Sequence, residues 1–146
     1  VGAYTSSQDI QFENVVFSSF YRGISIVGLP QTNRGWQCDY VKLSRLRFIY
    51  NTDAGIYSNT TNANWKIQSS LFINPQKTAA QNADSMHCER SGGIYLEDTF
   101  GGGFPHALGG TYLKVLISGN ITVINSQTES MTNSFVLNAT KIAGVG

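Results

Sequence analysis

The chain has 146 residues, a length that fits one domain with a sizeable buried core. Charged residues make up only 13% and the formal net charge is +1, so the composition gives no general attraction to nucleic acid or to an anionic membrane. Hydrophobic residues make up 41%, which excludes a disordered chain, and no apolar run approaches the ~20 residues of a membrane-spanning helix. We expect one domain over residues 1–146, either complete or a fragment of a longer chain, with no nucleic-acid partner and no membrane span.

The first predicted coil runs from about Ile10 to Gly28. Apolar and polar residues alternate at its start, and Phe17 follows Ile10 by seven residues. A turn then leads to Gly23-Ile24, where a second short strand begins. Alternation with a period of two is typical of half-buried strands, so we expect Ile10, Phe12 and Phe17 to point inward.

The second and third predicted coils repeat this pattern. Each begins with an apolar-polar-apolar triplet, places a Phe seven residues after the first residue of the triplet, and continues to a Gly-Ile pair. The repeated segments are Val41-Lys42-Leu43, Phe48 and Gly55-Ile56, then Trp65-Lys66-Ile67, Phe72 and Gly93-Ile94. A repeat of a few dozen residues built on alternating strands predicts parallel strands stacked coil upon coil, with the Phe residues in one internal row and the Ile residues in another.

The third coil is longer than the first two. Phe72 and Gly93 are 21 residues apart, whereas the same interval is 6 and 7 residues in the first and second coils. The extra segment, at about residues 75–90, is expected to be a loop or a short helix, and such insertions often carry the binding site of a solenoid. After Gly93, a glycine-rich loop at 101–103 and strand candidates at 112–117, 121–124 and 134–137 complete roughly four to six coils.

The spacing apolar-x-apolar-x-x-apolar-x-Phe, a turn, then Gly-Ile resembles the coils of the right-handed parallel β-helix superfamily. That superfamily includes pectate lyases, polygalacturonases and phage tailspikes, and the resemblance covers about residues 10–137. It implies an all-β fold, a right-handed parallel β-helix. We expect an extracellular protein (secreted, on a cell surface or on a virion) that binds polysaccharide, because of the tyrosines Tyr57 and Tyr95 and the 75–90 segment. An antiparallel sandwich also uses short strands and polar turns, but it does not require row-by-row repetition of Phe and Gly-Ile.

The resemblance extends to catalysis only in part. Asn51-Thr52-Asp53 is similar to the first acidic motif of polygalacturonases, but their paired aspartates, Gly-His-Gly and Arg-x-Lys are absent. Paired carboxylates in or after the 75–90 segment can act as acid and base of a glycoside hydrolase or polysaccharide lyase, or hold calcium; no other cofactor is expected. The candidate catalytic residues are Asp84, His87, Glu89, Arg90, Glu97 and Asp98. A solvated charged loop explains the same residues without activity.

Tyrosines supply the candidate binding surface. Tyr57 and Tyr95 each follow a Gly-Ile pair, so we expect them to stack on the outside as an aromatic platform for sugar rings, extended by Trp36 and Trp65. An alternative function is that of a structural module of a virion tailspike, an adhesin or another extracellular fibre. Neither end of the chain resembles the amphipathic cap that solenoids use, so the ends would pack against partner subunits in a homo-oligomer or continue into a longer chain.

Overall fold

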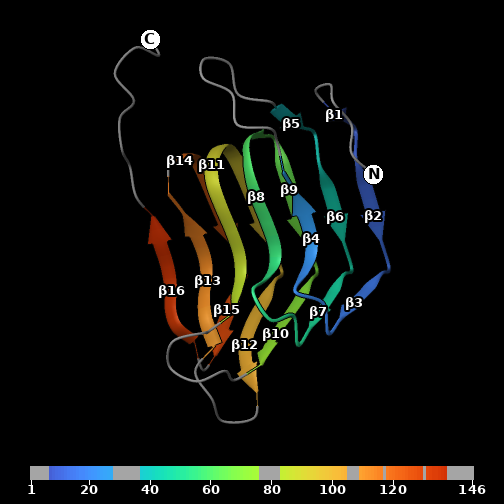
Figure 1. Ribbon diagram of the computed structural model, residues 1–146. Helices are drawn as coiled ribbons and strands as arrows, with labels where there is room; N and C mark the ends of the chain where they lie inside the picture. The colour runs from blue at the N-terminus through green and yellow to red at the C-terminus, as the bar shows by residue number, and fades with distance from the viewer. Residues whose placement is uncertain are drawn as a thin grey trace.

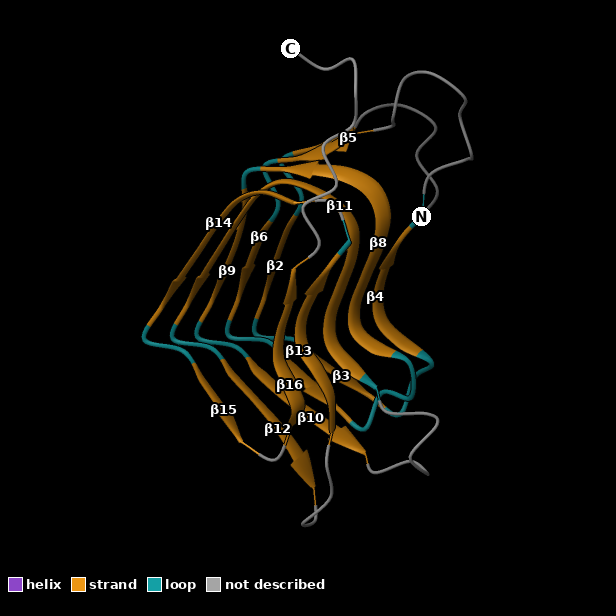
Figure 2. Ribbon diagram, turned by 90° about the vertical axis from the view of Figure 1, so that its left-hand side faces the viewer, coloured by secondary structure: helices purple, strands orange, loops and turns teal. Residues whose placement is uncertain are grey.

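A computed structural model describes residues 7–27, 37–75, 83–104, 109–116, 118–129 and 131–137, and every regular element in these ranges is a strand. The strands wind into a solenoid with three faces of five parallel strands each (Figures 1 and 2). The first face contains β2 (Gln11–Glu13), β6 (Lys42–Ser44), β9 (Trp65–Gln68), the C-terminal part of β11 (Asp84–Glu97) and β14 (Ser118–Ile124). The second face contains β3 (Val16–Ser18), β7 (Arg47–Ile49), β10 (Leu71–Pro75), β12 (Phe100–Phe104) and β15 (Gln127–Glu129).

The third face contains β4 (Arg22–Ile26), the N-terminal part of β8 (Ala54–Ala63), the N-terminal part of β11, β13 (Gly109–Val115) and β16 (Met131–Leu137). Strands β8 and β11 are long and bend from the third face toward the first, as Figure 2 shows. Two short strands, β1 (Ser7–Gln8) and β5 (Gln37–Asp39), extend the sheet beside the C-terminal part of β8. The all-β parallel β-helix predicted from the repeat is therefore confirmed.

The inward rows begin as the sequence predicts. Phe17, Phe48 and Phe72 occupy one ladder position in successive coils, and their rings stack at centroid distances of 5.2 and 4.7 Å. Ile24 and Ile56 are paired in a second row on the third face. Phe48, Phe72 and Ile56 are each at most 2% exposed. These rows form the core, because each coil covers the apolar side of its neighbour.

The third coil differs from the prediction. Gly93-Ile94 does not follow Gly55-Ile56 in its row; the partner of Ile56 is Met86, and Ile94 pairs with Trp65 on the first face. The segment expected to be an insertion, 75–90, is also different: β10 ends at Pro75 and residues 84–90 lie in strand β11, while 76–82 fall outside the described residues. In the described part of this segment there is no helix, and the residues complete the third face.

The fourth coil exchanges the positions of its large and small core residues. Gly101 stands in the Phe row opposite Phe72, and Tyr112 stands in the row that begins with Gly23 and Gly55. A Cβ added at Gly55 would lie 2.7 Å from Cδ1 of Phe72, and one added at Gly101 would lie 2.3 Å from Cδ2 of Tyr112. In the fourth coil the Tyr112 ring thus fills, from the third face, the internal space that the Phe rings fill from the second face in earlier coils. The segment expected to be a glycine-rich loop, 101–103, is part of strand β12.

The corners between faces use left-handed backbone conformations. Between the first and second faces, five successive corner residues have φ between 47° and 57°: Asn14, Arg45, Ser69, Asp98 and Asn125. Asn51, 1% exposed, holds the next corner: its side chain accepts a hydrogen bond from the Phe20 amide and donates one to the Phe17 carbonyl, both at 3.1 Å. The similarity of Asn51-Thr52-Asp53 to a hydrolase motif therefore coincides with a structural corner.

Candidate functional site

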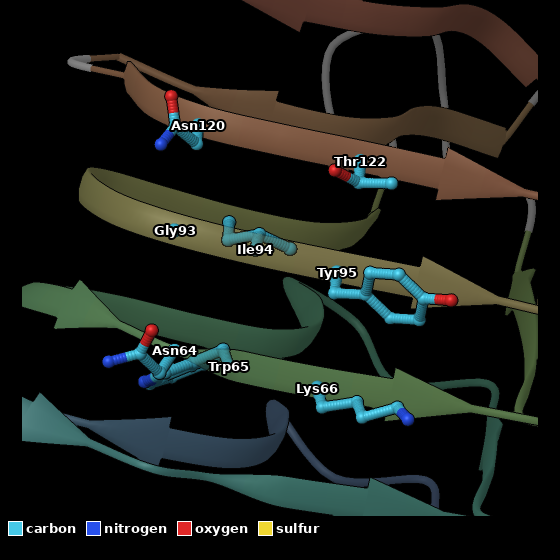
Figure 3. Close-up of a pocket in the computed structure, with 8 residues that line it drawn as sticks. All are labelled: Asn64, Trp65, Lys66, Gly93, Ile94, Tyr95, Asn120 and Thr122. Carbon is cyan, nitrogen blue, oxygen red and sulfur yellow. The ribbon is translucent and has the colours of Figure 1, made fainter.

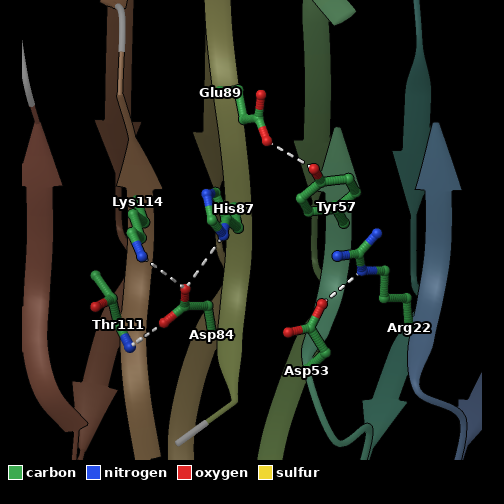
Figure 4. A network of polar contacts seen from close by, with 8 residues as sticks. All are labelled: Arg22, Asp53, Tyr57, Asp84, His87, Glu89, Thr111 and Lys114. Atoms are coloured by element: carbon green, nitrogen blue, oxygen red, sulfur yellow. Dashed lines mark hydrogen bonds and ion pairs between the residues drawn. The ribbon is translucent and has the colours of Figure 1, made fainter. Parts of the chain in front are cut away.

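The polar side chains of β11 that were predicted to be catalytic lie on two faces of the solenoid. Asp84, His87 and Glu89 come from the N-terminal part of β11 and lie on the third face, near Tyr57 of β8 (Figure 4). Glu97 ends the C-terminal part of the same strand on the first face. The bend in β11 separates the two groups, so the predicted catalytic residues do not form one cluster.

Asp84 is held by groups of the neighbouring strand. Its Oδ1 accepts a hydrogen bond from the Thr111 amide at 2.8 Å, and its Oδ2 lies 3.9 Å from Nζ of Lys114 and 3.6 Å from Nδ1 of His87. Its side chain is only 14% exposed, and this burial raises its pKa above the usual 3.8 although Thr111, Lys114 and His87 act in the opposite direction.

His87 is also largely buried. Burial lowers the pKa of its imidazole, and the positive charge of Lys114 adds to this effect, which outweighs the opposing field of Asp84. The Nε2 atom is buried without a hydrogen-bond partner among the described residues. The ring packs edge-on against Tyr57, with centroids 5.4 Å apart. The imidazole is therefore a neutral packing group at pH 7, and its buried Nε2 faces no solvent.

Tyr57 and Glu89 form a second set of contacts on the third face. The Tyr57 hydroxyl donates to Glu89 Oε1 at 2.7 Å, and burial together with this carboxylate raises the pKa of the tyrosine. The guanidinium of Arg22 lies over the Tyr57 ring, 3.4 Å from its centroid, and its Nε donates to Asp53 Oδ2 at 2.5 Å. Arg22 covers one face of this tyrosine, His87 packs against its ring and Glu89 binds its hydroxyl, so it is not an open platform for a sugar ring.

The separation of Asp84 and Glu89 does not suit acid–base cleavage of a glycosidic bond by this pair. Glycosidases hold their two carboxyl groups about 5–9.5 Å apart. Asp84 and Glu89 are five residues apart on one strand, roughly 16 Å along an extended chain. They also point to opposite neighbours, Asp84 toward β13 and Glu89 toward β8 (Figure 4). Among the described residues, no group of three or more His, Cys, Asp or Glu side chains is placed to hold a metal ion, calcium included.

Glu97 and Asp98 have local partners or a local conformation of their own. Gln68 donates from Nε2 to Glu97 Oε2 at 2.5 Å across the first face. Asp98 occupies the left-handed corner with φ 51° and is exposed. Asp, like Asn, tolerates this conformation, which accounts for its presence without a catalytic role.

The first face has a shallow depression of about 310 Å³. It is lined by Asn64, Trp65, Lys66, Gly93, Ile94, Tyr95, Asn120 and Thr122 (Figure 3). Asn64, Gly93 and Asn120 follow one another at the edge of three neighbouring strands, so the missing side chain of Gly93 leaves a gap between two exposed amides. The Lys66 and Tyr95 side chains extend side by side along their strands, with Nζ 5.2 Å from the ring centroid (Figure 3).

The prediction that Tyr57 and Tyr95 stack on each other is wrong, because they lie on different faces of the solenoid. The side chain that follows Tyr57 on the third face is His87, and Tyr95 follows Lys66 on the first face. Trp65 does not extend a platform, because it is 1% exposed and its side chain belongs to the core. Trp36 lies outside the described residues, and Arg90 is placed in β11 with its side chain undescribed.

The sequence did not indicate Asn64, Gly93, Asn120 or Thr122 as binding residues. The signal was the coil period: Ile94 follows Trp65 by 29 residues and Ile121 follows Ile94 by 27, which marks both as coil starts and aligns the residues on either side of them.

Comparisons of the chain with protein-family models, with curated proteins and with solved structures found no significant match. In the part of the chain that the structure describes, no helix is long and apolar enough to cross a membrane. What the structure defines is the class: an all-β parallel solenoid with one self-paired polar face and one face that carries a depression.

Proposed function

We propose that this chain is a polysaccharide-binding β-helix domain that uses the first face, and that its preferred ligands are acidic. The main observation that supports this proposal is the depression beside Gly93, where one aromatic ring, one lysine and two exposed side-chain amides converge. Aromatic rings cover the apolar faces of sugars, amides satisfy hydroxyl groups, and an ammonium group attracts a carboxylate.

The charge distribution on the first face supports an acidic ligand. Lys42 lies beside Lys66 in the adjacent strand, and both side chains are exposed. Neither lysine forms a salt bridge with another described residue, whereas Arg22 and Lys114 on the third face both lie within 4 Å of an aspartate. The row from Lys42 through Lys66 to Tyr95 crosses three coils, so a polymer lying along the solenoid axis can meet all three side chains.

Binding without cleavage is the role that the arrangement favours, because the carboxylates of β11 are split between two faces and are already hydrogen-bonded. Descent from the right-handed parallel β-helix superfamily, and with it an extracellular location, is part of the same proposal; its support is the three-faced parallel architecture and the sequence rows. The alternative role, a structural module of a tailspike, adhesin or fibre, uses the ends of the solenoid and is compatible with binding on the first face.

The test is calorimetric binding of a polyuronate such as polygalacturonate, with a neutral glucan as the comparison ligand. We expect the polyuronate to bind more tightly and its affinity to fall as salt is raised. Lys66→Gln should weaken binding about fivefold, as expected for loss of an exposed ion pair worth ~1 kcal/mol. Arg47→Gln is the matched control, because Arg47 is an exposed cation in β7 on the second face.

Gly93 provides the sharper test of location. A Cβ at this position would lie 3.5 Å from the Asn64 amide nitrogen and 3.9 Å from the Asn120 carbonyl, which are ordinary contacts. Gly93→Ala should therefore fold and bind nearly normally, whereas Gly93→Leu fills the depression and should abolish binding at unchanged thermal stability. Equal binding by the Leu variant, or no binding of any polyuronate by the folded chain, would overturn the proposal.

A further inference from the structure

One outward row of the first face changes its chemistry along the solenoid axis. In this row, which we call the central row, Lys42 and Lys66 stand on two successive strands and Tyr95 stands on the third. Adjacent strands lie about 4.8 Å apart, and neither lysine forms a salt bridge with another described residue. Like charges directly opposite on adjacent strands repel each other. A ligand with two neighbouring negative charges would relieve that repulsion.

The row next to the central row, toward the corner with the second face, is neutral beside the lysines and acidic beside the tyrosine. Ser44 and Gln68 stand beside the two lysines, and Glu97 stands beside Tyr95. Residues two apart on a strand point to the same side, so the Glu97 carboxylate lies next to the Tyr95 side chain. Partial burial raises the pKa of the Tyr95 hydroxyl, and the charge of Glu97 raises it further. The field of this carboxylate therefore reaches the third position of the central row.

The row on the other side of the central row opens beside the tyrosine. Asn64 stands beside Lys66, whereas Gly93 stands beside Tyr95 and has no side chain (Figure 3). A ligand ring can therefore lie in the depression against the Tyr95 side chain. The third position of the central row thus offers an aromatic ring and free space next to a negative charge, whereas the first two positions offer positive charge.

We infer that the first face recognises the boundary of an acidic block in a polysaccharide: two adjacent acidic units over Lys42 and Lys66, followed by one uncharged unit over Tyr95. This inference rests on the proposed function and adds the order of the units that the site prefers. An acidic unit in the third position would bring its carboxylate next to Glu97, which repels it. An uncharged unit keeps the contact with the aromatic ring and avoids that repulsion.

Galacturonate trisaccharides with methyl esters at defined units test this order, because an ester removes the charge of one unit and keeps its sugar ring. The probes are the triacid, the two isomers esterified at one terminal unit, and the isomer esterified at the central unit. Titrations followed by NMR measure their dissociation constants. At least one terminal ester should bind roughly threefold more tightly than the triacid, because it lacks the charge that Glu97 repels. The central ester should bind about fivefold more weakly than the triacid, because it loses the contact with Lys66.

Glu97→Gln tests the origin of the preference. The new amide keeps an acceptor for Gln68, so the variant should fold. The triacid and the preferred terminal ester should then bind within about twofold of each other, since the repelling charge is gone. Glu129→Gln is the matched control, because Glu129 is an exposed carboxylate in β15 on the second face. This control should keep the wild-type preference.

Lys42→Gln separates the two charged positions from the third. It should weaken the triacid and the preferred terminal ester about fivefold each, and so leave their ratio unchanged. A triacid that binds as tightly as both terminal esters, or a preference that survives Glu97→Gln, would contradict the inference. Polygalacturonate that still binds in a Lys66-dependent way would then leave the proposed function standing. Failure of the proposed function is a separate result, because it shows as no binding of polygalacturonate at all.

Discussion

The exchange of aromatic and glycine positions in the fourth coil makes a quantitative prediction about the core. Gly101→Ala places a Cβ 2.3 Å from Cδ2 of Tyr112 and 3.1 Å from Oγ of Ser85. Ordinary carbon contacts are at least about 3.5 Å, so the ring would have to shift by roughly 1 Å. Tyr112 is 2% exposed and its hydroxyl hydrogen-bonds with Thr99, which leaves little room for that shift.

Overpacking of a tight core costs typically 1–3 kcal/mol, and we expect Gly101→Ala to lie near ~2–3 kcal/mol because the contact is short and the ring is held. Tyr112→Ala removes a buried ring and should cost about 3–5 kcal/mol. In the double variant the added methyl group occupies part of the space that the ring has left. Gly101→Ala should then be nearly neutral, which gives a favourable coupling of about 2 kcal/mol.

Urea unfolding of the four proteins in this cycle measures the coupling. Gly93→Ala is the matched single control, since its Cβ makes only ordinary contacts, and it should change the free energy of unfolding by less than about 1 kcal/mol. If Gly101→Ala costs the same in the presence and absence of the Tyr112 ring, the two residues do not share one internal space, and the explanation of the fourth coil fails.

Three further predictions concern the polar contacts. Because the pKa of His87 is lowered in the folded chain, the unfolded chain binds a proton at a higher pH than the folded chain does. The contribution of His87 to stability is therefore full above about pH 6.5 and is lost as the pH drops through the folded-state pKa. Urea unfolding at a series of pH values should show that His87→Gln removes this loss. The raised pKa of Asp84 has the opposite sign, with stability present below 3.8 and lost as the pH rises through the folded-state value. At pH 7 Asp84→Asn, which keeps an acceptor for the Thr111 amide, should therefore cost less than Asp84→Ala, which strands that amide at about 1–3 kcal/mol; equal costs would contradict this account. Asn51→Ala removes both hydrogen bonds of a buried corner and should lower the free energy of unfolding by about 2–3 kcal/mol, whereas a change within 0.5 kcal/mol would show that the corner does not depend on this side chain.

The sequence predicts the coils because inward rows repeat one residue type. Phe17, Phe48 and Phe72 keep the same interval from the start of each coil, and the structure stacks them. The prediction fails where the Gly-Ile row changes its residue types and the same dipeptide occurs on another face. Ser85-Met86 replaces Gly-Ile on the third face, and Gly93-Ile94 shows that dipeptide at the edge of the first face. Local alternation cannot separate these positions, since both are strand positions with an apolar residue pointing inward.

That single shift of register also moved the predicted site. With Gly93-Ile94 assigned to the third face, Tyr95 stacks on Tyr57 and the residues before it become a projecting loop. With Ile94 beside Trp65, Tyr95 joins the lysines of the first face, and Asp84 enters the ladder between Ala54 and Thr111. Partners one coil away decide what a side chain can do in a solenoid, and those partners are 22–32 residues distant in the sequence.

The two polar faces then have different capacities for ligands. On the third face four charged side chains already have a counterpart in the next coil: Arg22 with Asp53, and Lys114 with Asp84. A ligand there must displace those contacts and leave partly buried charges uncompensated, which is costly. On the first face the Lys66 ammonium lies over the Tyr95 ring, 5.2 Å from its centroid, without a salt bridge to another described residue, and Gly93 supplies the space beside it. A ligand carboxylate there gains a counter-ion without displacing one, which is why we place binding on the first face although the third has more ionisable residues.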